Sequence, residues 1–321
     1  MKICMLGSGS LGSAIGGVLA EAGQEVYLIR RSPEHVKAIN ASGLRLREDF
    51  CDRVVQVRAA TDCQGIGTVD LVIVLVKSYH TRVAVESARP IIGEHTVVLS
   101  LQNGFGNEET ISELVGPRHV LGGRTYVGGK MLAPGHVLIG VKGKQTILGE
   151  LDGSVSERVR RIAAEFNWAG LPTEVTTNIV GTMWDKLLVN VATGALSGIT
   201  RLPYGGLYRV PEVRECALAA VAEAMAVARA SGVELATRKP EDAWITAAEG
   251  LPDEFKASIL QSIENGLPTE VDYINGSVVR CGEKCQVPTP VNRALVAGIK
   301  GVEYWLKHYA AQPALGEGPA S

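Results

Sequence analysis

The sequence lacks a strong excess of either charge, since 32 lysines and arginines stand against 34 aspartates and glutamates. Neither a basic surface that would hold nucleic acid nor an acidic tail is therefore expected. No apolar run is long enough to span a bilayer, and glycines break the opening MKICMLGSGSLG at once, so neither a membrane span nor a signal peptide is expected. A small-molecule partner and a cytoplasmic location fit these absences best.

Cysteine is also sparse, with six residues in a chain of 321 and no C-x-x-C pair among them. So long a chain does not depend on a disulfide scaffold, and reduced thiols are expected. Cys281 and Cys285 could share a helix face, but two thiols without further ligands make a poor metal site. We therefore expect no metal.

The sequence contains no H-E-x-x-H, no G-x-S-x-G and no P-loop, which leaves hydrolase and phosphotransfer functions without support. Histidine is a poor candidate for a catalytic acid because none falls among the central helices predicted for the second half. The six are His35, His80, His95, His119, His136 and His308.

The first half alternates short β-branched runs with helical patterns. Four runs have the continuous apolar character of strands buried on both faces, at residues 2–7, 25–30, 69–77 and 95–104. This alternation predicts a parallel α/β sheet. Glycine-punctuated pieces at residues 123–150 predict hairpins that extend the sheet.

After about Val175 the pattern changes to long helical periods. Pro211 opens one such helix and Gly232 closes it, as proline at the first helical turn and glycine beyond the last one commonly do. The second half is therefore expected to be mostly α-helical. The tail at residues 311–321 is small, rich in proline and glycine, and predicted to be disordered.

A glycine-rich motif, GSGSLG, follows the first predicted strand and precedes a predicted helix. This is the context that dinucleotide binding requires. The first glycine permits the turn, the second lets the backbone approach a pyrophosphate, and the third allows close helix packing, while the helix N-terminus favours the phosphate charge. The predicted cofactor-binding residues are Gly7, Ser8, Gly9, Ser10, Leu11 and Gly12.

At the end of the second strand, where NAD enzymes commonly carry an acid, the sequence reads YLIRRS. Arg30 and Arg31 stand in its place. A guanidinium can bind the 2′-phosphate of NADPH through paired hydrogen bonds and can stack on adenine. The alternative is a pair of solvated surface arginines.

Two more polar residues end predicted strands. Lys77 lies in VLVKSYH and Asn103 in LQNGFGN. Open α/β sheets bind ligands at the carboxyl ends of their strands, so both are expected beside the nicotinamide. Alternatively, Lys77 lies in solvent and Asn103 with Gly104 forms a tight turn.

The stretch MWDKLLVN places Lys186 and Asn190 four residues apart, on one face of an apolar helix. Taken alone, this pattern favours a lysine whose stem lies on the surface and whose amine reaches solvent.

Together, GSGSLG, Arg31, Lys77, QNG, WDKLLVN and TEVDYING occur in the order found in the ketopantoate reductase family, which this chain resembles over nearly its whole length. The resemblance implies a Rossmann-type NADP-binding domain at residues 1–176 and an all-α substrate domain at 177–310. It also implies NADPH-dependent reduction of a 2-oxo acid in a cleft between them, most simply 2-dehydropantoate to (R)-pantoate in pantothenate biosynthesis.

Carried over residue by residue, the resemblance makes Lys186 the catalytic lysine, facing the oxygen where charge develops. Glu270 is the second catalytic residue, orienting either Lys186 or the substrate hydroxyl. Asn103, Asn190 and Ser258 are expected to bind the substrate. A homodimer is left open.

The chain departs from the family pattern at two positions. Gly194 stands where the family has a side chain, and Phe255 lies in a region that is usually more polar. We interpret both as signs of a roomier or more apolar pocket, suited to another 2-oxo acid. The remaining alternatives are a β-hydroxyacid dehydrogenase and a non-catalytic NADP-binding regulator.

Overall fold

The computed structural model describes residues 1–309, so the predicted disordered tail at 311–321 lies outside the described residues. The chain divides into two compact units, Met1–Met183 and one that begins at Trp184. The division falls within helix α6 (Ile179–Thr200). Over residues 1–309, no helix is both long and apolar enough to cross a membrane.

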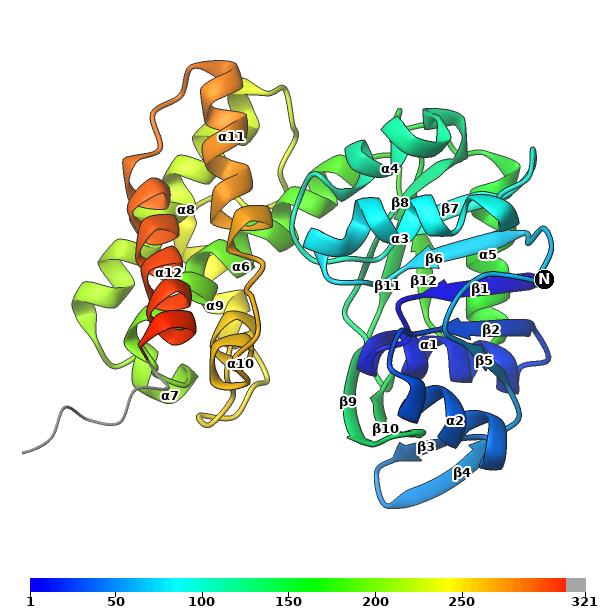
Figure 1. Cartoon of the computed structure of the whole chain (residues 1–321). Helices are drawn as coiled ribbons and strands as arrows, with labels where there is room; N and C mark the ends of the chain where they lie inside the picture. Colours follow the sequence, from blue (N-terminus) through cyan, green and yellow to red (C-terminus); the bar gives the residue numbers. More distant parts are fainter. Residues whose placement is uncertain (310–321) are drawn as a thin grey trace, which may run out of the picture. The chain divides into compact units, whose positions relative to one another are not determined.

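The first unit is built on an eight-stranded sheet of the described chain, in the order β12-β11-β8-β7-β6-β1-β2-β5 (Figure 1). Its strands are β1 (Lys2–Leu6), β2 (Glu25–Ile29), β5 (Arg58–Ala60), β6 (Leu71–Val74), β7 (Val97–Ser100), β8 (Val120–Thr125), β11 (Thr146–Gly149) and β12 (Thr173–Val175). The four strands predicted from apolar runs are β1, β2, β6 and β7, and they pair in parallel as expected. The predicted α/β class is confirmed.

The prediction that the glycine-punctuated segment extends this sheet is only partly correct. Strands β8 and β11 do extend it as an antiparallel pair. Between them, β9 (Gly128–Ala133) and β10 (His136–Gly140) instead join β3 (Leu44–Glu48) and β4 (Cys51–Val55) in a four-stranded sheet of the described residues. A Cβ on Gly129 would lie 2.7 Å from the carbonyl oxygen of Ser10, so the backbone of β9 passes close to the start of α1.

Helix α1 (Ser10–Glu21) packs against both sheets, which explains why it is apolar around its circumference. A Cβ on Gly16 would meet Leu28 at 2.6 Å, in the large sheet, and a Cβ on Gly17 would meet Leu44 at 2.8 Å, in the small one. Successive glycines, which point about 100° apart on a helix, therefore let the two sheets approach two different sides of α1. This packing fixes the start of α1 relative to β1.

Alternate residues of β1 face two separate cores. Ile3 and Met5 pack with α1 and α5 (Glu157–Trp168), whereas Cys4 and Leu6 pack with the residues of α3 (Thr81–Ser87) and α4 (Asn107–Val115). Helices thus cover both faces of the large sheet (Figure 1). A further helix, α2 (Pro33–Ser42), packs against β5 and β3.

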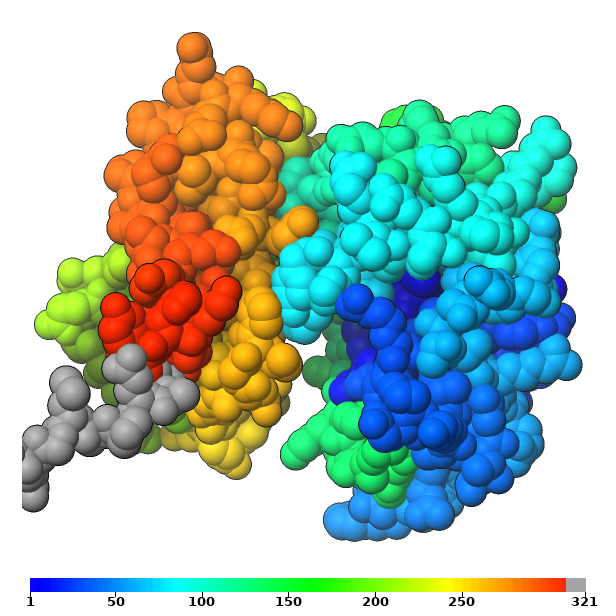
Figure 2. All heavy atoms as spheres, viewed as in Figure 1, coloured from blue at the N-terminus to red at the C-terminus, as the bar shows by residue number. Residues whose placement is uncertain are grey.

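The described part of the second unit consists of helices and their connections, as predicted. Its helices after α6 are α7 (Tyr204–Leu207), α8 (Pro211–Ala230), α9 (Pro240–Ala248), α10 (Ser258–Glu264), α11 (Asn275–Cys285) and α12 (Pro290–His308). Helix α8 begins at Pro211, as expected. Helices α11 and α12 pack on α8, and their side chains form a continuous surface, orange to red in Figure 2.

Candidate active site

The predicted cofactor residues of the first unit end neighbouring strands of the large sheet. In the order β7-β6-β1-β2, the strands are followed by Asn103, Lys77, the glycine turn and Arg31. Because these strands are parallel, their carboxyl ends meet at one edge. With strands about 4.8 Å apart, the row spans about 15 Å, a length suited to a dinucleotide.

The glycine turn has one open position between two closed ones. A Cβ on Gly7, whose φ is +107°, would lie 2.5 Å from the backbone of Val76, and a Cβ on Gly12 would lie 2.3 Å from the carbonyl oxygen of Gly7. In contrast, a Cβ on Gly9 would have only the Arg30 guanidinium nearby, at 3.6 Å. Gly9 caps α1, so open space lies in front of the helix N-terminus, where phosphate oxygens bind favourably.

The carbonyl oxygen of Ser8 holds this turn in place. It accepts hydrogen bonds from Ser13 Oγ at 3.0 Å and from Arg30 Nη1 at 3.1 Å. Ser13 Oγ in turn lies 3.1 Å from Nε2 of His35, a buried residue of α2 whose Nδ1 accepts a hydrogen bond from the Gly135 amide. Burial, and to a lesser extent the charge of Arg30, lower the pKa of His35 to about 4. A neutral histidine therefore buttresses the glycine turn.

Arg30 and Arg31 occupy different environments. Arg30 is partly buried, and burial lowers its pKa. Arg31 is exposed at the end of β2. Lys77 is exposed as well and lies just before a short 3-10 turn, Ser78–His80. The row thus offers two exposed cations, Arg31 and Lys77, along the edge where the glycine turn lies.

Asn103 is exposed, but its backbone is held on several sides. Its carbonyl oxygen accepts hydrogen bonds from Ser78 Oγ and Asn107 Nδ2, both at 3.1 Å. Gln102 Nε2 donates to the carbonyl of Val76 at 2.8 Å. The turn that bears Asn103 is therefore tied to the segment that bears Lys77.

In the second unit, Lys186 and Asn190 lie one turn apart on α6, and both are half-buried. Between them lie the buried Leu187 and Leu188. Asp185, for which the sequence suggested no role, accepts hydrogen bonds from the amides of Ala236 and Thr237 at 3.0 and 2.9 Å. The carboxylate beside Lys186 thus anchors α6 to the segment that follows α8.

Ser258 is exposed at the first position of α10, and its neighbour Ile259 packs against α6. A Cβ on Gly194 would lie 3.2 Å from Cδ1 of Ile259. Ile259 therefore limits the extra room expected at Gly194 on the side that faces α10, while the expectation of a more apolar pocket stays a prediction. The glycine allows α10, and with it Ser258, to approach α6.

Phe255 lies in the segment before α10 and packs edge-on against Tyr204, with ring centroids 5.2 Å apart. The Tyr204 hydroxyl lies 3.1 Å from Thr193 Oγ1, on α6. Phe255 therefore belongs to an aromatic group beside α6, and it remains 36% exposed. Its predicted effect on substrate choice stays a prediction.

Glu270 is buried, with 6% of its surface exposed, and precedes a 3-10 turn, Val271–Tyr273. Its carbonyl oxygen accepts hydrogen bonds from the Tyr273 and Ile274 amides, and these bonds hold Glu270 at the start of that turn. The amide of Thr269 donates to a carboxylate oxygen of Glu303 at 2.7 Å. Helix α12 therefore fixes the backbone on which Glu270 lies.

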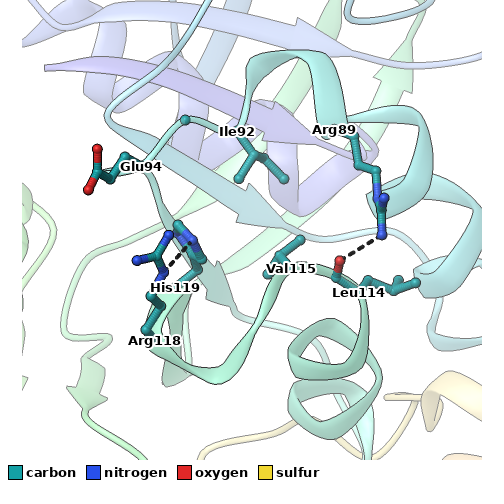
Figure 3. Close-up of a pocket in the computed structure, with 8 residues that line it drawn as sticks. Arg89, Ile92, Glu94, Leu114, Val115, Arg118 and His119 are labelled. Carbon is teal, nitrogen blue, oxygen red and sulfur yellow. Dashed lines mark hydrogen bonds between the residues drawn. The ribbon is translucent and has the colours of Figure 1, made fainter.

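A cavity of about 480 Å³ lies elsewhere in the first unit (Figure 3). It is lined by Arg89, Ile92, Gly93, Glu94, Leu114, Val115, Arg118 and His119. These residues include the segments just before β7 and β8, so the cavity lies at the amino ends of the parallel strands. It is therefore at the edge opposite the glycine turn, and no predicted site residue lines it.

Three residues of the first unit that the sequence reasoning did not single out contribute to the turns. His35 buttresses the glycine turn, while Asn107 and Arg124 hold the carbonyls around Asn103. A signal was present for Arg124, because a lone charge within the apolar run VLGGRT predicts a buried, paired group. No local pattern marks Asn107 or His35, whose partners are distant in sequence or in another element.

A glycine turn at the edge of a parallel sheet, followed by a helical unit with Lys186 and Asn190 on its first helix, is typical of two-domain oxidoreductases that use a dinucleotide. The family described as ketopantoate reductase PanE/ApbA matches residues 3–153, and its C-terminal domain matches residues 178–303. The chain therefore belongs to the ketopantoate reductase family, and it is an oxidoreductase.

Individual relatives and solved structures resemble this chain over nearly its whole length. The 2-dehydropantoate 2-reductase of Pyrococcus horikoshii is 36% identical over 94% of this chain and 98% of its own length. A crystal structure of a PanE/ApbA family ketopantoate reductase from Ralstonia eutropha is 37% identical, with a TM-score of 0.87 over 96% of this chain and 100% of that one. D-mandelate dehydrogenase, solved with NADH and anilino(oxo)acetate, is 25% identical, with a TM-score of 0.87 over 96% of this chain and 99% of its own.

Proposed function

We propose that the protein reduces a 2-oxo acid to a 2-hydroxy acid with NADPH, and that its substrate is 2-dehydropantoate, converted to (R)-pantoate for pantothenate biosynthesis. The family membership of both units supports the reaction class. The observation that carries the choice of cofactor is the exposed Arg31 at the end of β2, where an NAD enzyme commonly has an acid.

Several features of the first unit support NADPH binding. The open position at Gly9 and the N-terminus of α1 would take the pyrophosphate. Arg31 would bind the 2′-phosphate through charge-assisted hydrogen bonds. Lys77 and Asn103, farther along the row, would border the nicotinamide, with Asn103 also contacting the substrate. When bound, NADPH supplies the hydride.

The residues of the second unit would provide the acid and the substrate-binding groups that the reduction needs. Lys186 would donate a hydrogen bond, and finally a proton, to the substrate oxygen on which negative charge develops. Asn190 and Ser258 would bind substrate oxygens without adding charge. Glu270 would orient Lys186 or the substrate hydroxyl.

A second candidate substrate class is an apolar or aromatic 2-oxo acid. The similarity to D-mandelate dehydrogenase extends over nearly the whole chain, and Phe255 with Tyr204 places aromatic surface beside α6. Such a group favours an aromatic substrate over the hydroxylated pantoate skeleton.

An assay of NADPH and NADH oxidation with a panel of 2-oxo acids tests the proposal. The panel comprises 2-dehydropantoate, 2-oxoisovalerate and phenylglyoxylate. We expect the highest kcat/KM for 2-dehydropantoate with NADPH. A preference for phenylglyoxylate would select the second candidate, and no oxidation with any member would refute both. A non-catalytic regulator would bind NADPH, seen as a change in nicotinamide fluorescence, without oxidising it.

A further inference from the structure

In the turn that carries Asn103, the carbonyl oxygens of Gln102, Asn103 and Gly104 all accept hydrogen bonds from side chains. Ser78 and Asn107 bind that of Asn103 itself. The carbonyls on either side, of Gln102 and Gly104, accept hydrogen bonds from one guanidinium, that of Arg124 on β8: Nη1 lies 3.0 Å from the first and Nη2 lies 2.9 Å from the second. One planar side chain therefore spans the turn from beneath the exposed Asn103.

Arg124 is almost completely buried, and so is its ion-pair partner, Glu108, in the first turn of α4. Their side chains are 3% and 2% exposed, and Arg124 Nη1 lies 3.3 Å from Glu108 Oε1. The second oxygen, Oε2, is buried without a hydrogen-bond partner among the described residues. Arg124 gives its closer contacts to backbone carbonyls and only a long one to the carboxylate.

Such an arrangement is a poor choice for stability alone. Burying two charges costs solvation that a long contact recovers incompletely, and an apolar pair of similar volume commonly serves as well or better. The geometry of a guanidinium, however, suits the binding of two carbonyls held a fixed distance apart. What the ion pair specifies here is the conformation of the turn.

The turn needs such a constraint because of its composition. Gly104 and Gly106 adopt φ values of +83° and +103°, and glycine enters and leaves this region at little steric cost. Without fastened carbonyls, the segment around Phe105 would sample several conformations. Asn103 would then meet its ligand in the required orientation for only part of the time.

We propose that Arg124 is a positioning residue, which orients Asn103 toward the substrate by binding the carbonyls on either side of it. The proposal rests on the proposed 2-oxo acid reduction. Arg124 does not touch substrate or cofactor and acts only through the turn. Its loss therefore impairs the steps in which Asn103 takes part. The glycine turn and Arg31, which would bind the pyrophosphate and the 2′-phosphate, stay in place, so NADPH affinity falls less than kcat does.

The test is Arg124→Lys, which keeps the buried charge beside Glu108 but cannot span two carbonyls. We expect kcat on the best 2-oxo acid to fall about 10- to 100-fold, the scale of a misplaced reacting group. The Kd for NADPH should rise by much less, since only the contact at the nicotinamide end is disturbed. Asn103→Ala alone should lower kcat. Adding it to Arg124→Lys should lower kcat little further, because both substitutions remove the same interaction. Additive losses would overturn the proposal.

Arg158→Lys is the matched control. Arg158 binds Glu150 and the carbonyl of Val120, at the amino end of the same strand β8. Its replacement should leave kcat and KM unchanged. If Arg124→Lys fails to fold, the double variant Arg124→Met with Glu108→Leu removes both charges together and should show the same loss of kcat.

Hydrogen exchange separates this proposal from the proposed function. The amides of residues 103–106 should exchange faster in Arg124→Lys than in the unmodified protein. In Arg158→Lys their exchange rates should not change. If the unmodified protein reduces no 2-oxo acid, the proposed function fails, while unchanged exchange at this turn would overturn the role of Arg124 whatever the activity.

Discussion

Arg30 donates a hydrogen bond from Nη1 to the carbonyl oxygen of Ser8, 3.1 Å away, and so links the end of β2 to the glycine turn after β1. The next residue, Arg31, is exposed. Two adjacent arginines therefore lie in different environments. Arg30 belongs to the architecture of the turn, and the exposed Arg31 is the one that we expect to bind the 2′-phosphate.

The first prediction concerns cofactor preference. Arg31→Ala should weaken NADPH binding by about 1.5 to 3 kcal/mol, the range for hydrogen bonds to charged groups, and leave NADH binding nearly unchanged. Titration of nicotinamide fluorescence with each cofactor measures both. Arg30→Ala is the comparison: it should weaken both cofactors alike, because it loosens the turn that holds their shared pyrophosphate. Equal affinities for NADPH and NADH in the unmodified protein would exclude the role of Arg31.

The second prediction concerns the lysine on α6. Lys186→Ala should lower kcat about 100-fold or more, as the loss of a donor to a developing oxyanion does, with little change in NADPH affinity. Glu270→Ala should lower kcat too. If the carboxylate positions the lysine, the increase in activation free energy of the double variant should be smaller than the sum of the two single increases. Steady-state kinetics measure all three. Replacement of the exposed Lys284 by alanine is the control, and a folded Lys186→Ala variant with normal kcat would contradict the mechanism.

The third prediction concerns the packing of α10 on α6. A Cβ on Gly198 would lie 2.7 Å from both Ile259 Cγ2 and Ile299 Cδ1, closer than the 3.2 Å contact at Gly194. Gly198→Ala should therefore lower the free energy of unfolding by about 1 to 3 kcal/mol through overpacking. Gly194→Ala should be nearly neutral, since a gain of about 1 kcal/mol in helix propensity offsets a milder contact.

Ile259→Val distinguishes the two glycines in urea unfolding. It removes Cδ1, the atom nearest to position 194, and should relieve Gly194→Ala. It keeps Cγ2, and should not relieve Gly198→Ala. Equal relief of both variants would mean that the helices shift as a unit, contrary to this prediction.

The fourth prediction concerns pH. His35 is buried and neutral, and its pKa of about 4 lies below the usual 6.5. As pH falls below about 6.5, the unfolded chain takes up a proton that the folded protein does not, so the free energy of unfolding declines until about pH 4. At about 1.4 kcal/mol per pKa unit, the loss is at most about 3.5 kcal/mol.

Urea unfolding at pH 7 and pH 5 measures this effect. His35→Gln should reduce the difference between the two values, because glutamine does not titrate. His95→Gln, at an exposed histidine, is the control and should retain the full difference. A pH dependence unaffected by His35→Gln would assign the decline to other groups.

Much of the fold could be predicted because its elements carry local patterns. Continuous apolar runs marked β1, β2, β6 and β7, and Pro211 marked the start of α8. The separate sheet that contains β9 and β10 could not be predicted in this way. Alternation and glycine punctuation indicate a hairpin. They do not indicate which strand pairs with it, because β3, the partner of β10, lies far away in the sequence.

The domain bounds and the roles of the site residues remain predictions. Motif order and spacing indicated Lys186, Asn190, Ser258 and Glu270 through a family resemblance, and the second unit holds all four. The sequence alone also suggested a roomier or more apolar pocket at Gly194, but it could not show that the Ile259 side chain lies beside this glycine and limits the room there.

The sequence by itself determined the parallel sheet, the glycine turn at its edge, the helical second half and the family. These follow from hydrophobic periodicity and short motifs, which depend on neighbours along the chain. Only the tertiary structure decided which arginine supports the turn, what fills the space at Gly194 and which buried charge holds Asn103. Each of these depends on groups that only folding brings together, such as Ser8 with Arg30, Gly194 with Ile259, or Gln102 with Arg124. Burial and hydrogen bonding between distant segments set those roles, and neither is written in any one stretch of sequence.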